Sequence, residues 1–391
     1  MEYMAKNIPL WQITTWDKNF NNVDKEWQPK TIKYKYLLSD ELDSLRVDDG
    51  DIRILYTGKD VGYTTEELAG DNISEGEVVS IPWGGIPTVK YHKGKFVTGD
   101  NRIATSNDTS KLTNKYLYYY LQGNIGEIAS YYRGASLKHP CMKDVLKMTI
   151  SYPSVQEQEK ICSQFDMLEW LIEARKQELQ LLDDLIKARF VEMFGSPVSN
   201  PMSWEKRTLK EVCIKLNDGS HFSPESFETG DYKYVTAKNI KFSGFDFSNI
   251  TYVPEAVHRP IFDRCNPEFE DVLYIKDGAT TGVAIVNTLD EEFTLLSSVA
   301  LLKQDRSIMN GYFLATLLNN KDMYLNIRNN MGGAAITRLT IAKLNAIEII
   351  VPPIELQNQF AAFVAEVDKS KLMFQKLHQK LNILQQKAGD I

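Results

Sequence analysis

The sequence predicts an α+β protein made of two similar globular halves, each followed by a long helix, with the two helices packed as an antiparallel coiled coil. Three observations predict this fold: an internal repeat, a heptad pattern of apolar residues after the first copy, and a similar pattern after the second. Apolar residues make up 43% and charged residues 25% of the 391 positions. This composition is typical of a folded globular protein.

The repeat is clearest where residues 134–161 align without a gap with residues 333–360. Both segments begin with Gly-Ala, keep their apolar residues in the same phase, and end on a proline followed five positions later by a glutamine. The match continues upstream, where EVVSIPWGGIPTV at 77–89 parallels DVLYIKDGATTGV at 271–283. The gapless match and the looser one upstream of it together indicate a duplicated structural plan with a pseudo-two-fold internal repeat.

Each copy ends in a strand, a proline and a helix. Alternating apolar residues predict strands over 148–152 and 347–351, and a proline ends each of them. In the first copy Ser154 and Glu157 have the spacing of a helix capping box. We therefore divide the chain into a first domain, a central long helix, a second domain and a C-terminal long helix, with the boundaries 1–153, 154–196, 197–352 and 353–391.

The central helix carries the clearest periodicity, because its seam residues alternate four and three positions apart over about four to five heptads. Gly195, Ser196 and Pro197 end it. The seam of the central helix consists of Ile161, Phe165, Leu168, Ile172, Arg175, Leu179, Leu182, Ile186, Arg189 and Met193. The C-terminal helix has a similar stripe with one irregular step, consisting of Phe360, Val364, Val367, Lys371, Phe374, Leu377, Leu381 and Leu384.

A helix of about 40 residues is a rod of roughly 60 Å, and its own domain alone cannot bury so long a seam. We therefore expect the two helices to pack against each other in antiparallel orientation, and a homodimeric coiled coil is the alternative. The charged seam residues Arg175, Arg189 and Lys371 either fix the register or extend their charged ends to solvent.

Motifs of the common enzyme classes are absent. The chain has no phosphate-binding loop, dinucleotide fingerprint, zinc-protease motif or nucleophile elbow, and its five histidines lack metal-ligand spacing. Residues 266–269 (NPEF) lack the second proline that an amino-methyltransferase loop needs. These observations favour a non-catalytic chain that binds no metal or cofactor itself. An enzyme with a cryptic site and a protein-only coiled-coil scaffold are the alternatives.

The cysteines and the apolar runs predict the compartment. The four cysteines lie too far apart for a CxxC pair, and the N-terminal residues have no apolar run typical of a secretory signal. The longest apolar runs are shorter than the ~20 residues that a membrane span needs. We therefore expect reduced thiols in a cytoplasmic protein with no membrane partner.

Charge alone does not decide whether the chain binds nucleic acid. The net charge of −7 argues mildly against it, but the densest acidic excess, 9 acidic against 5 basic residues, lies in 154–196. Two basic stretches with interleaved aromatic residues, 88–102 and 232–242, are candidate binding segments. A solvated strand face explains either stretch nearly as well. The glycine-rich turns at 82–85 and 277–282 allow close approach of another backbone, although a plain structural turn is the default interpretation.

Together these motifs resemble the specificity (S) subunits of type I restriction-modification systems, over essentially the whole chain. The resemblance rests on the two Gly-Ala segments leading into long helices, and in the second half on SWEKRTLKEV, NDGSHFSPE, YVTAKNI and EDVLYIKDGATTGVAIV, with IKARFVEMFG closing the central helix. The first half opens differently, with IPLWQITTWDKNF, and lacks a counterpart of NDGSHFSPE.

The resemblance implies two target-recognition domains that read the half-sites of a bipartite, gapped duplex DNA target, mainly through the major groove. The helices would act as a ruler and as the dock for two modification subunits, which carry S-adenosylmethionine and methylate adenine. Restriction subunits, which use ATP and Mg, are a further possible partner. A ruler of roughly 60 Å and 3.4 Å per base pair limit the half-site separation to about 18 base pairs.

The candidate DNA contacts combine basic side chains for phosphate with polar side chains for base edges. They are Lys90, Lys93, Lys95 and Arg102 in the first domain, and His221, Lys238, Asn239, Lys241 and Thr280 in the second.

Overall fold

The structure is a computed structural model that describes residues 7–18, 31–58, 60–329 and 338–388, with the side chains of the last helix described as far as Leu372. The chain divides into two compact units, one of residues 1–176 with 376–391 and one of residues 177–375. Each long helix contributes to both units. The predicted boundaries, which treat the helices as separate segments, stay predictions.

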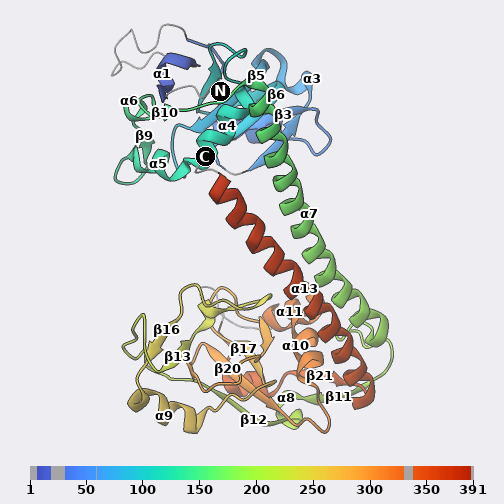
Figure 1. Cartoon of the computed structure of the whole chain (residues 1–391). Coiled ribbons are helices and arrows are strands. Elements are labelled where there is room, and N and C mark those ends of the chain that lie inside the picture. Colours follow the sequence, from blue (N-terminus) through green and yellow to red (C-terminus); the bar gives the residue numbers. More distant parts are fainter. Residues whose placement is uncertain (1–6, 19–30, 59, 330–337, 389–391) are drawn as a thin grey trace. The chain divides into compact units, whose positions relative to one another are not determined.

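The first unit is built on a six-stranded sheet with the strand order β2-β7-β5-β6-β3-β4. Neighbouring strands are antiparallel except β3 and β6, which run parallel, and helix α4 packs against β5 (Figure 1). Its elements are β1 (Ile8–Pro9), α1 (Leu10–Ile13), β2 (Thr14–Trp16), α2 (Ser39–Leu45), β3 (Ile52–Leu55), β4 (Val61–Thr64), α3 (Glu66–Ala69), η2 (Gly70–Asn72), β5 (Ser74–Pro82), β6 (Lys90–Thr98), β7 (Asn101–Ser106), α4 (Asn114–Gly123), α5 (Ile125–Ser130), β8 (Tyr132–Arg133), β9 (His139–Pro140), α6 (Met142–Val145) and β10 (Thr149–Ile150).

The second unit contains a four-stranded antiparallel sheet with the order β12-β20-β17-β18 and a three-stranded sheet with the order β16-β13-β19 (Figure 1). Helix α10 packs against β17 and β18. Its elements are β11 (Glu205–Thr208), α8 (Leu209–Val212), β12 (Cys213–Asp218), β13 (Tyr232–Val235), η3 (Ala237–Asn239), β14 (Ile240–Lys241), β15 (Gly244–Phe245), β16 (Thr251–Val253), α9 (Glu255–Arg264), β17 (Val272–Ile275), β18 (Ala284–Val286), β19 (Thr294–Leu295), β20 (Val299–Gln304), α10 (Gly311–Asn319), α11 (Lys321–Asn329), α12 (Ile341–Asn345) and β21 (Glu348–Val351).

The duplication that the sequence predicts is confirmed in the strand order. Strands β2-β7-β5-β6 of the first unit correspond to β12-β20-β17-β18 of the second. The N-termini match as well: the amide of Leu10 donates to the carbonyl of Met148 (2.8 Å), and the amide of Leu209 donates to that of Ile347 (2.9 Å). Both pairs are related by a shift of 199 residues, so the first half begins with the same elements as the second despite its different sequence.

A buried glutamine fastens the long helix to each unit. The Gln158 side chain, 0% exposed, accepts a hydrogen bond from the amide of Thr113 (2.9 Å) and donates to the carbonyls of Lys111 (2.6 Å) and Pro153 (2.9 Å). Gln357 repeats this arrangement with the amide of Asn310 (2.9 Å) and the carbonyls of Ile308 (3.0 Å) and Pro352 (2.7 Å). We call these two residues the glutamine latches.

The predicted central helix is present as α7 (Val155–Phe194). Every residue of its predicted seam is buried or half-buried, which confirms the heptad interpretation. The hydroxyl of Ser154 accepts from the amide of Glu157 (3.4 Å), as in one half of a capping box. Gly195 ends the helix with φ of +73°, a left-handed conformation that favours glycine.

Within the second unit, the end of α7 packs against the start of α13 (Ile354–Ala388) in antiparallel orientation. The rings of Phe190 and Phe360 lie 5.6 Å apart, and toward the start of α7 the carboxylate of Asp183 pairs with Lys371 (2.7 Å). The predicted antiparallel packing is therefore confirmed for this segment, and Lys371 joins the two helices through an ion pair. The seam residues Phe374, Leu377, Leu381 and Leu384 lie outside the described side chains.

Candidate nucleic-acid interface

The two glycine-rich turns occupy equivalent places in the two units, directly after β5 and directly after β17. In the first unit, the ring of His139 contacts the carbonyl oxygen of Trp83 through Nδ1 (2.6 Å). In the second unit, the residues at the same two positions of the repeat, Asp277 and Arg338, form an ion pair (3.2 Å). The same two loops therefore meet in both units, but they meet through different chemistry.

Three loops of the second unit gather around Ser297 and Ser298. The amide of Ser297 donates to the carbonyl of Ser220 (2.8 Å), the amide of Ala237 donates to the hydroxyl of Ser298 (3.3 Å), and the amide of Lys276 donates to the carbonyl of Ser298 (2.9 Å). These bonds bring together the segments that precede His221, Lys238 and Thr280, three of the predicted contact residues, and all three side chains are exposed.

The floor of this cluster is a closed charge network. Lys276 is 2% exposed and pairs with Asp218 (3.3 Å) and Asp277 (2.8 Å). Asp218 is also buried and faces His221 (3.1 Å) and Arg264 (3.8 Å). A buried charge needs such partners, so Lys276 holds the loops in place and does not offer its charge to a ligand.

Strands β14 and β15 form a hairpin beside this cluster. Lys241 and Phe242 lie at its tip, and both side chains are exposed. The ring of Phe242 lies 6.0 Å from that of Tyr324 on α11. A Cβ atom on Gly282 of the glycine-rich turn would lie 2.5 Å from Cε2 of the same tyrosine, and Arg328 of α11 donates to the carbonyl of Thr281 (2.7 Å). Helix α11 therefore joins the hairpin tip to the glycine-rich turn.

Asn239 requires a correction, because the structure gives it a structural contact instead of a free amide. It is 3% exposed, its Oδ1 accepts from the amide of Thr236 (3.0 Å), and its Nδ2 donates to the carbonyl of Asp246 (3.2 Å). An amide with both ends occupied by backbone is not available to a base edge. Asn239 instead fixes the root of the β14–β15 hairpin.

The predicted contact residues of the first unit are engaged inside the unit. The ammonium of Lys90 donates to the carbonyls of Tyr56 and Gly58, and burial lowers its pKa to about 8. Lys95 pairs with Glu66 (3.1 Å), and Lys93 reaches Glu77 (3.8 Å) but keeps most of its side chain exposed. Of these three lysines, Lys93 is the one that remains most accessible to a phosphate.

Arg102 also requires a correction. Its side chain is 1% exposed, it pairs with Asp17 (3.4 Å) and Asp100, and its guanidinium lies 4.5 Å from the centre of the Trp83 ring. Contact with DNA would require this group to leave both carboxylates. Arg102 therefore supports the loop that contains Trp83 from inside.

The repeat points to first-unit residues that composition did not single out. Ile86 occupies the position of Thr280 and is 74% exposed, between Gly85 and Pro87. Leu137 and Lys138 of the neighbouring loop are also exposed, and the amide of Gly85 donates to the carbonyl of Lys138 (3.2 Å). Carrying Thr280 over to the first copy of the repeat would have found Ile86.

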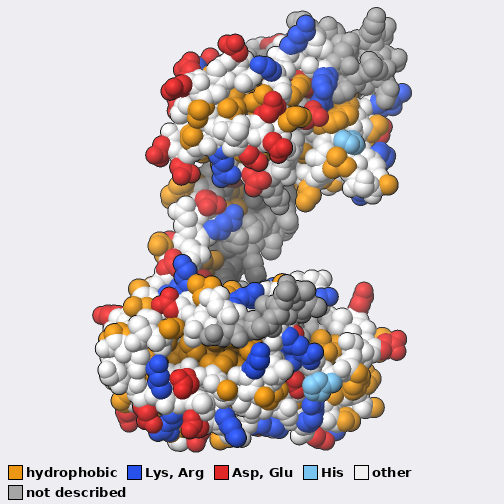
Figure 2. Space-filling view, turned by 180° about the vertical axis from the view of Figure 1, so that it is seen from behind, with side chains coloured by type: hydrophobic (Ala, Val, Ile, Leu, Met, Phe, Trp, Pro, Cys, Tyr) orange, Lys and Arg blue, Asp and Glu red, His pale blue; other side chains and the backbone are white. Residues whose placement is uncertain are grey.

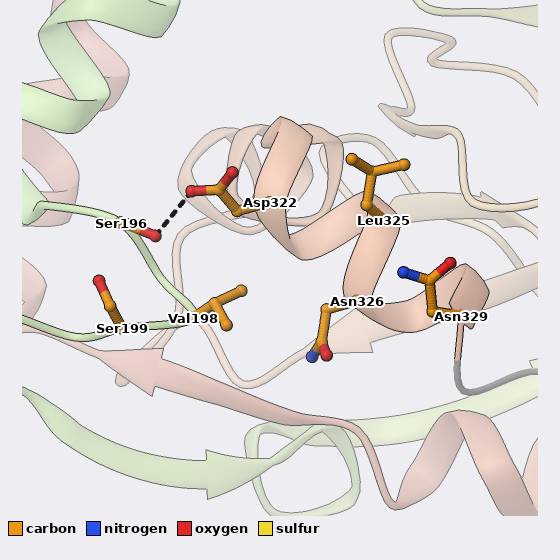
Figure 3. Close-up of a pocket in the computed structure, with 7 residues that line it drawn as sticks. All are labelled: Ser196, Val198, Ser199, Asp322, Leu325, Asn326 and Asn329. Atoms are coloured by element: carbon orange, nitrogen blue, oxygen red, sulfur yellow. Dashed lines mark hydrogen bonds between the residues drawn. The ribbon is translucent and has the colours of Figure 1, made fainter.

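A surface pocket of about 490 Å³ lies on the side of α11 that faces the segment after α7 (Figure 3). In it the hydroxyl of Ser196 donates to the carboxylate of Asp322 (2.9 Å). Val198, Leu325 and three polar residues complete the lining, none of them basic. The pocket has no basic side chain and contains the carboxylate of Asp322, which repels phosphate, so it is a poor candidate for the nucleic-acid interface.

The described residues show no other centre of chemistry. None of them form a group of histidine, cysteine and acidic side chains that could hold a metal ion. The four cysteines are free, and burial raises the pKa values of Cys162, Cys213 and Cys265 to about 11 or 12.

Figure 2 shows basic and acidic side chains interspersed on the face in view, in keeping with the net charge of −7. None of the helices in the described part of the chain is long and apolar enough to cross a bilayer.

The fold and the loop clusters define a duplicated protein in which the same two loops meet once in each unit. Comparison with known proteins identifies the family of the chain. The model of the type I restriction modification DNA specificity domain matches residues 31–183 and again residues 201–384. The chain belongs to this family.

Individual relatives agree with this assignment. The chain is 24% identical over 279 residues to the type I restriction enzyme MjaIX specificity subunit of Methanocaldococcus jannaschii, an alignment that covers 65% of this chain and 62% of that relative. The crystal structure of a type I restriction-modification S subunit from M. genitalium matches 99% of this chain and 95% of its own, with a TM-score of 0.61 and 16% identity. A chain from a structure described as the basis of complex assembly and conformational transition of the type I R-M system matches with a TM-score of 0.52 and 16% identity, over 99% of this chain and 98% of its own.

Proposed function

We propose that this chain is the sequence-specific DNA-binding subunit of a type I restriction-modification complex and reads a bipartite, gapped target. The observation that carries the proposal is the repeated pair of loops. Each unit holds a glycine-rich turn against the segment that follows the Gly-Ala motif, on a scaffold fixed by the same glutamine latch. Two such surfaces on one chain suit two half-sites.

The side chains on the two surfaces differ, which supports the reading of two different half-sites. The first unit places Trp83, His139 and Ile86 where the second places Asp277, Arg338 and Thr280. Apolar groups contact the methyl group of thymine, whereas charged and hydroxyl groups exchange hydrogen bonds with base edges. The two units therefore have different recognition chemistry on one fold.

Phosphate contacts fall to the exposed lysines at the edges of these surfaces. Lys238 and Lys241 lie on either side of Asn239, and both are exposed. In the first unit, Lys93 and Lys138 are the accessible candidates. Such contacts position a protein on duplex DNA and carry no sequence information themselves. His221 and Thr280 are then the candidate base readers of the second unit.

The long helices serve as spacer and as dock for two modification subunits. At 1.5 Å per residue, the 40 residues of α7 measure about 60 Å, which limits the half-site separation to about 18 base pairs at 3.4 Å each. The acidic excess of residues 154–196 disfavours contact between this helix and phosphate. S-adenosylmethionine belongs to the modification subunits in this proposal, and ATP and Mg belong to restriction subunits where these are present.

The test is base-modification sequencing of genomic DNA from cells that express the modification subunit with or without this chain. The proposal expects methylated adenine at a gapped, two-part motif only when the chain is present. With all proteins soluble and expressed, an unchanged methylation pattern would refute it and favour a protein-only scaffold. Modification of DNA by the purified chain alone would favour an enzyme with its own site.

A domain exchange tests whether recognition is modular. Residues 1–153 are replaced by the corresponding segment of another family member, and the methylated motif is determined again. One half-site should change while the other and its spacing remain. A change in both half-sites, or in neither, would contradict the assignment of one half-site to each unit.

A further inference from the structure

The β14–β15 hairpin of the second unit carries an exposed phenylalanine on a rigid base. Phe242 is 63% exposed at the turn between the two strands. At the root of the hairpin, Ile240 pairs with Phe245 and is fully buried, and the amide of Asp246 donates to the carbonyl of Asn239 (2.8 Å). The tip is therefore held out from the surface by a fixed support, and an exposed aromatic ring in such a place needs an explanation.

The charge around the tip suits the backbone of DNA. Lys238 and Lys241 are both exposed and lie four and one residues before Phe242. The nearest acid along the hairpin, Asp246, has its carboxylate bound by the amide (3.0 Å) and the hydroxyl (2.6 Å) of Ser248. An exposed apolar ring that follows two exposed lysines fits a surface that is apolar in its groove and anionic along its edges.

The ring also faces the recognition surface of this unit. Tyr324 supports Phe242 from one side and lies directly against Gly282 of the glycine-rich turn, two residues after Thr280. A tilted ring contact of this kind restricts the ring and leaves its other edge free. Phe242 is thus placed next to the base-reading candidates and not on a remote face.

Resting on the function proposed above, we propose that Phe242 is a specificity-determining residue that contacts the 5-methyl group of a thymine in the major groove of the half-site read by the second unit. The major groove admits a two-stranded ribbon such as this hairpin, and the thymine methyl group is the apolar feature among the base edges there. A phenylalanine cannot exchange hydrogen bonds with a base edge, so the methyl group is the feature it can distinguish.

The test removes that methyl group and nothing else. Duplexes carrying the methylated motif are made with each thymine of the second half-site replaced in turn by uracil, and binding to the full chain in complex with its modification subunits is measured. At one position the wild-type complex should bind the uracil duplex about fourfold more weakly, because it loses the free energy gained by burying one methyl group. Phe242→Ala should bind the thymine and uracil duplexes equally, at the weaker level. Phe242→Leu should keep part of the difference.

Phe269→Ala is the matched control, because Phe269 is also exposed but precedes β17, at the end of the strand opposite the glycine-rich turn. This variant should keep the full wild-type preference for thymine.

Three results would overturn the inference while leaving the proposed function intact: a second half-site made only of G·C pairs, a wild-type complex indifferent to every uracil, or a Phe242→Ala complex with an unchanged uracil penalty. Failure of the proposed function would instead appear earlier, as the absence of any gapped motif. The inference about Phe242 would also be overturned if 2-aminopurine placed in the second half-site became more fluorescent on binding in a way that depends on Phe242. The ring would then lie between base pairs instead of against a methyl group.

Discussion

Replacement of a glutamine latch should destabilise one unit and leave the other unchanged. Gln357 closes three backbone groups that have left water: the amide of Asn310 and the carbonyls of Ile308 and Pro352. Gln357→Leu keeps a side chain of similar size and removes all three partners. A buried backbone group left without a partner costs about 1–3 kcal/mol. At the lower end for each group, the variant should lose about 3 kcal/mol of unfolding free energy in the second unit.

A two-unit chain has no single unfolding free energy, so the measurement must report on each unit. Native-state hydrogen exchange followed by mass spectrometry does so, because peptides are assigned to residues 1–176 or 177–375. Gln357→Leu should weaken protection in the second set, and Gln158→Leu should weaken it by a similar amount in the first. Gln359→Leu is the matched control, since Gln359 is exposed on the same helix and should change stability by less than about 0.5 kcal/mol.

The variant Gln357→Glu tests the same role of Gln357 through the pH dependence of its stability. The introduced carboxylate can accept from the amide of Asn310, but its second oxygen faces two carbonyls unless it is protonated. Burial and these carbonyls raise its folded-state pKa above the unfolded value of about 4.3. Its contribution is therefore most favourable below pH 4 and is lost as the pH rises through the folded pKa. Latch variants as stable as the exposed control, or a Gln357→Glu variant indifferent to pH, would refute the role assigned to the glutamines.

Two further predictions concern the charged groups. Burial raises the pKa of Asp17 to about 6 despite the nearby Arg102, so the contribution of Asp17 to stability is greatest below pH 4 and declines as the pH rises through 6. Relative to Asp17→Asn, the wild-type first unit should lose roughly 2 kcal/mol of stability between pH 4 and pH 7 by hydrogen exchange, and a wild-type stability that rises relative to the variant with pH would contradict the assignment. Lys241→Ala should weaken binding to all duplex sequences and lower the slope of log K against log salt by about 1 in a fluorescence titration, whereas loss of binding to the specific motif alone would make Lys241 a base reader.

Much of the fold could be predicted because its signals are local. The seam of α7 and the Gly-Ser-Pro sequence after it depend on residues a few positions apart, and the repeat shows in glycine, proline and apolar phase. The elements at the start of the first unit are harder to predict from the sequence. In the second unit Thr208 and Glu211 form a capping box at the start of α8, but the corresponding α1 follows Pro9, which offers no side-chain cap. The equivalence of α1 and α8 depends on backbone pairing with the end of each unit, which local patterns do not reveal.

The contact residues were harder to predict, because a side chain's availability depends on partners that are distant in sequence. Arg102 and Asp17 are 85 positions apart, and Lys95 of β6 meets Glu66 of α3, 29 positions away. Composition counts Arg102 and Lys95 as free basic groups, whereas in the fold each of them is paired with an acidic side chain. The lysines that stay exposed, such as Lys238 and Lys241, lie in a short helix and a hairpin with few neighbours. Exposure in the fold, which separates Lys93 from Lys90 on the same strand, therefore decides which basic side chains are available.

In each unit, the residues that hold the fold are different from the exposed loop residues proposed to contact DNA. Each latch binds one backbone amide and two backbone carbonyls, and the backbone pairs at the start of each unit recur at the same spacing. At the turn after β5 and β17 the two copies have diverged instead, from an aromatic contact to an ion pair and from an exposed isoleucine to an exposed threonine. Exposed loop residues contribute little to stability, so substitutions there can change recognition while the latches keep the scaffold folded. Under the proposed function, a protein organised in this way can acquire a new half-site in one unit without altering the other.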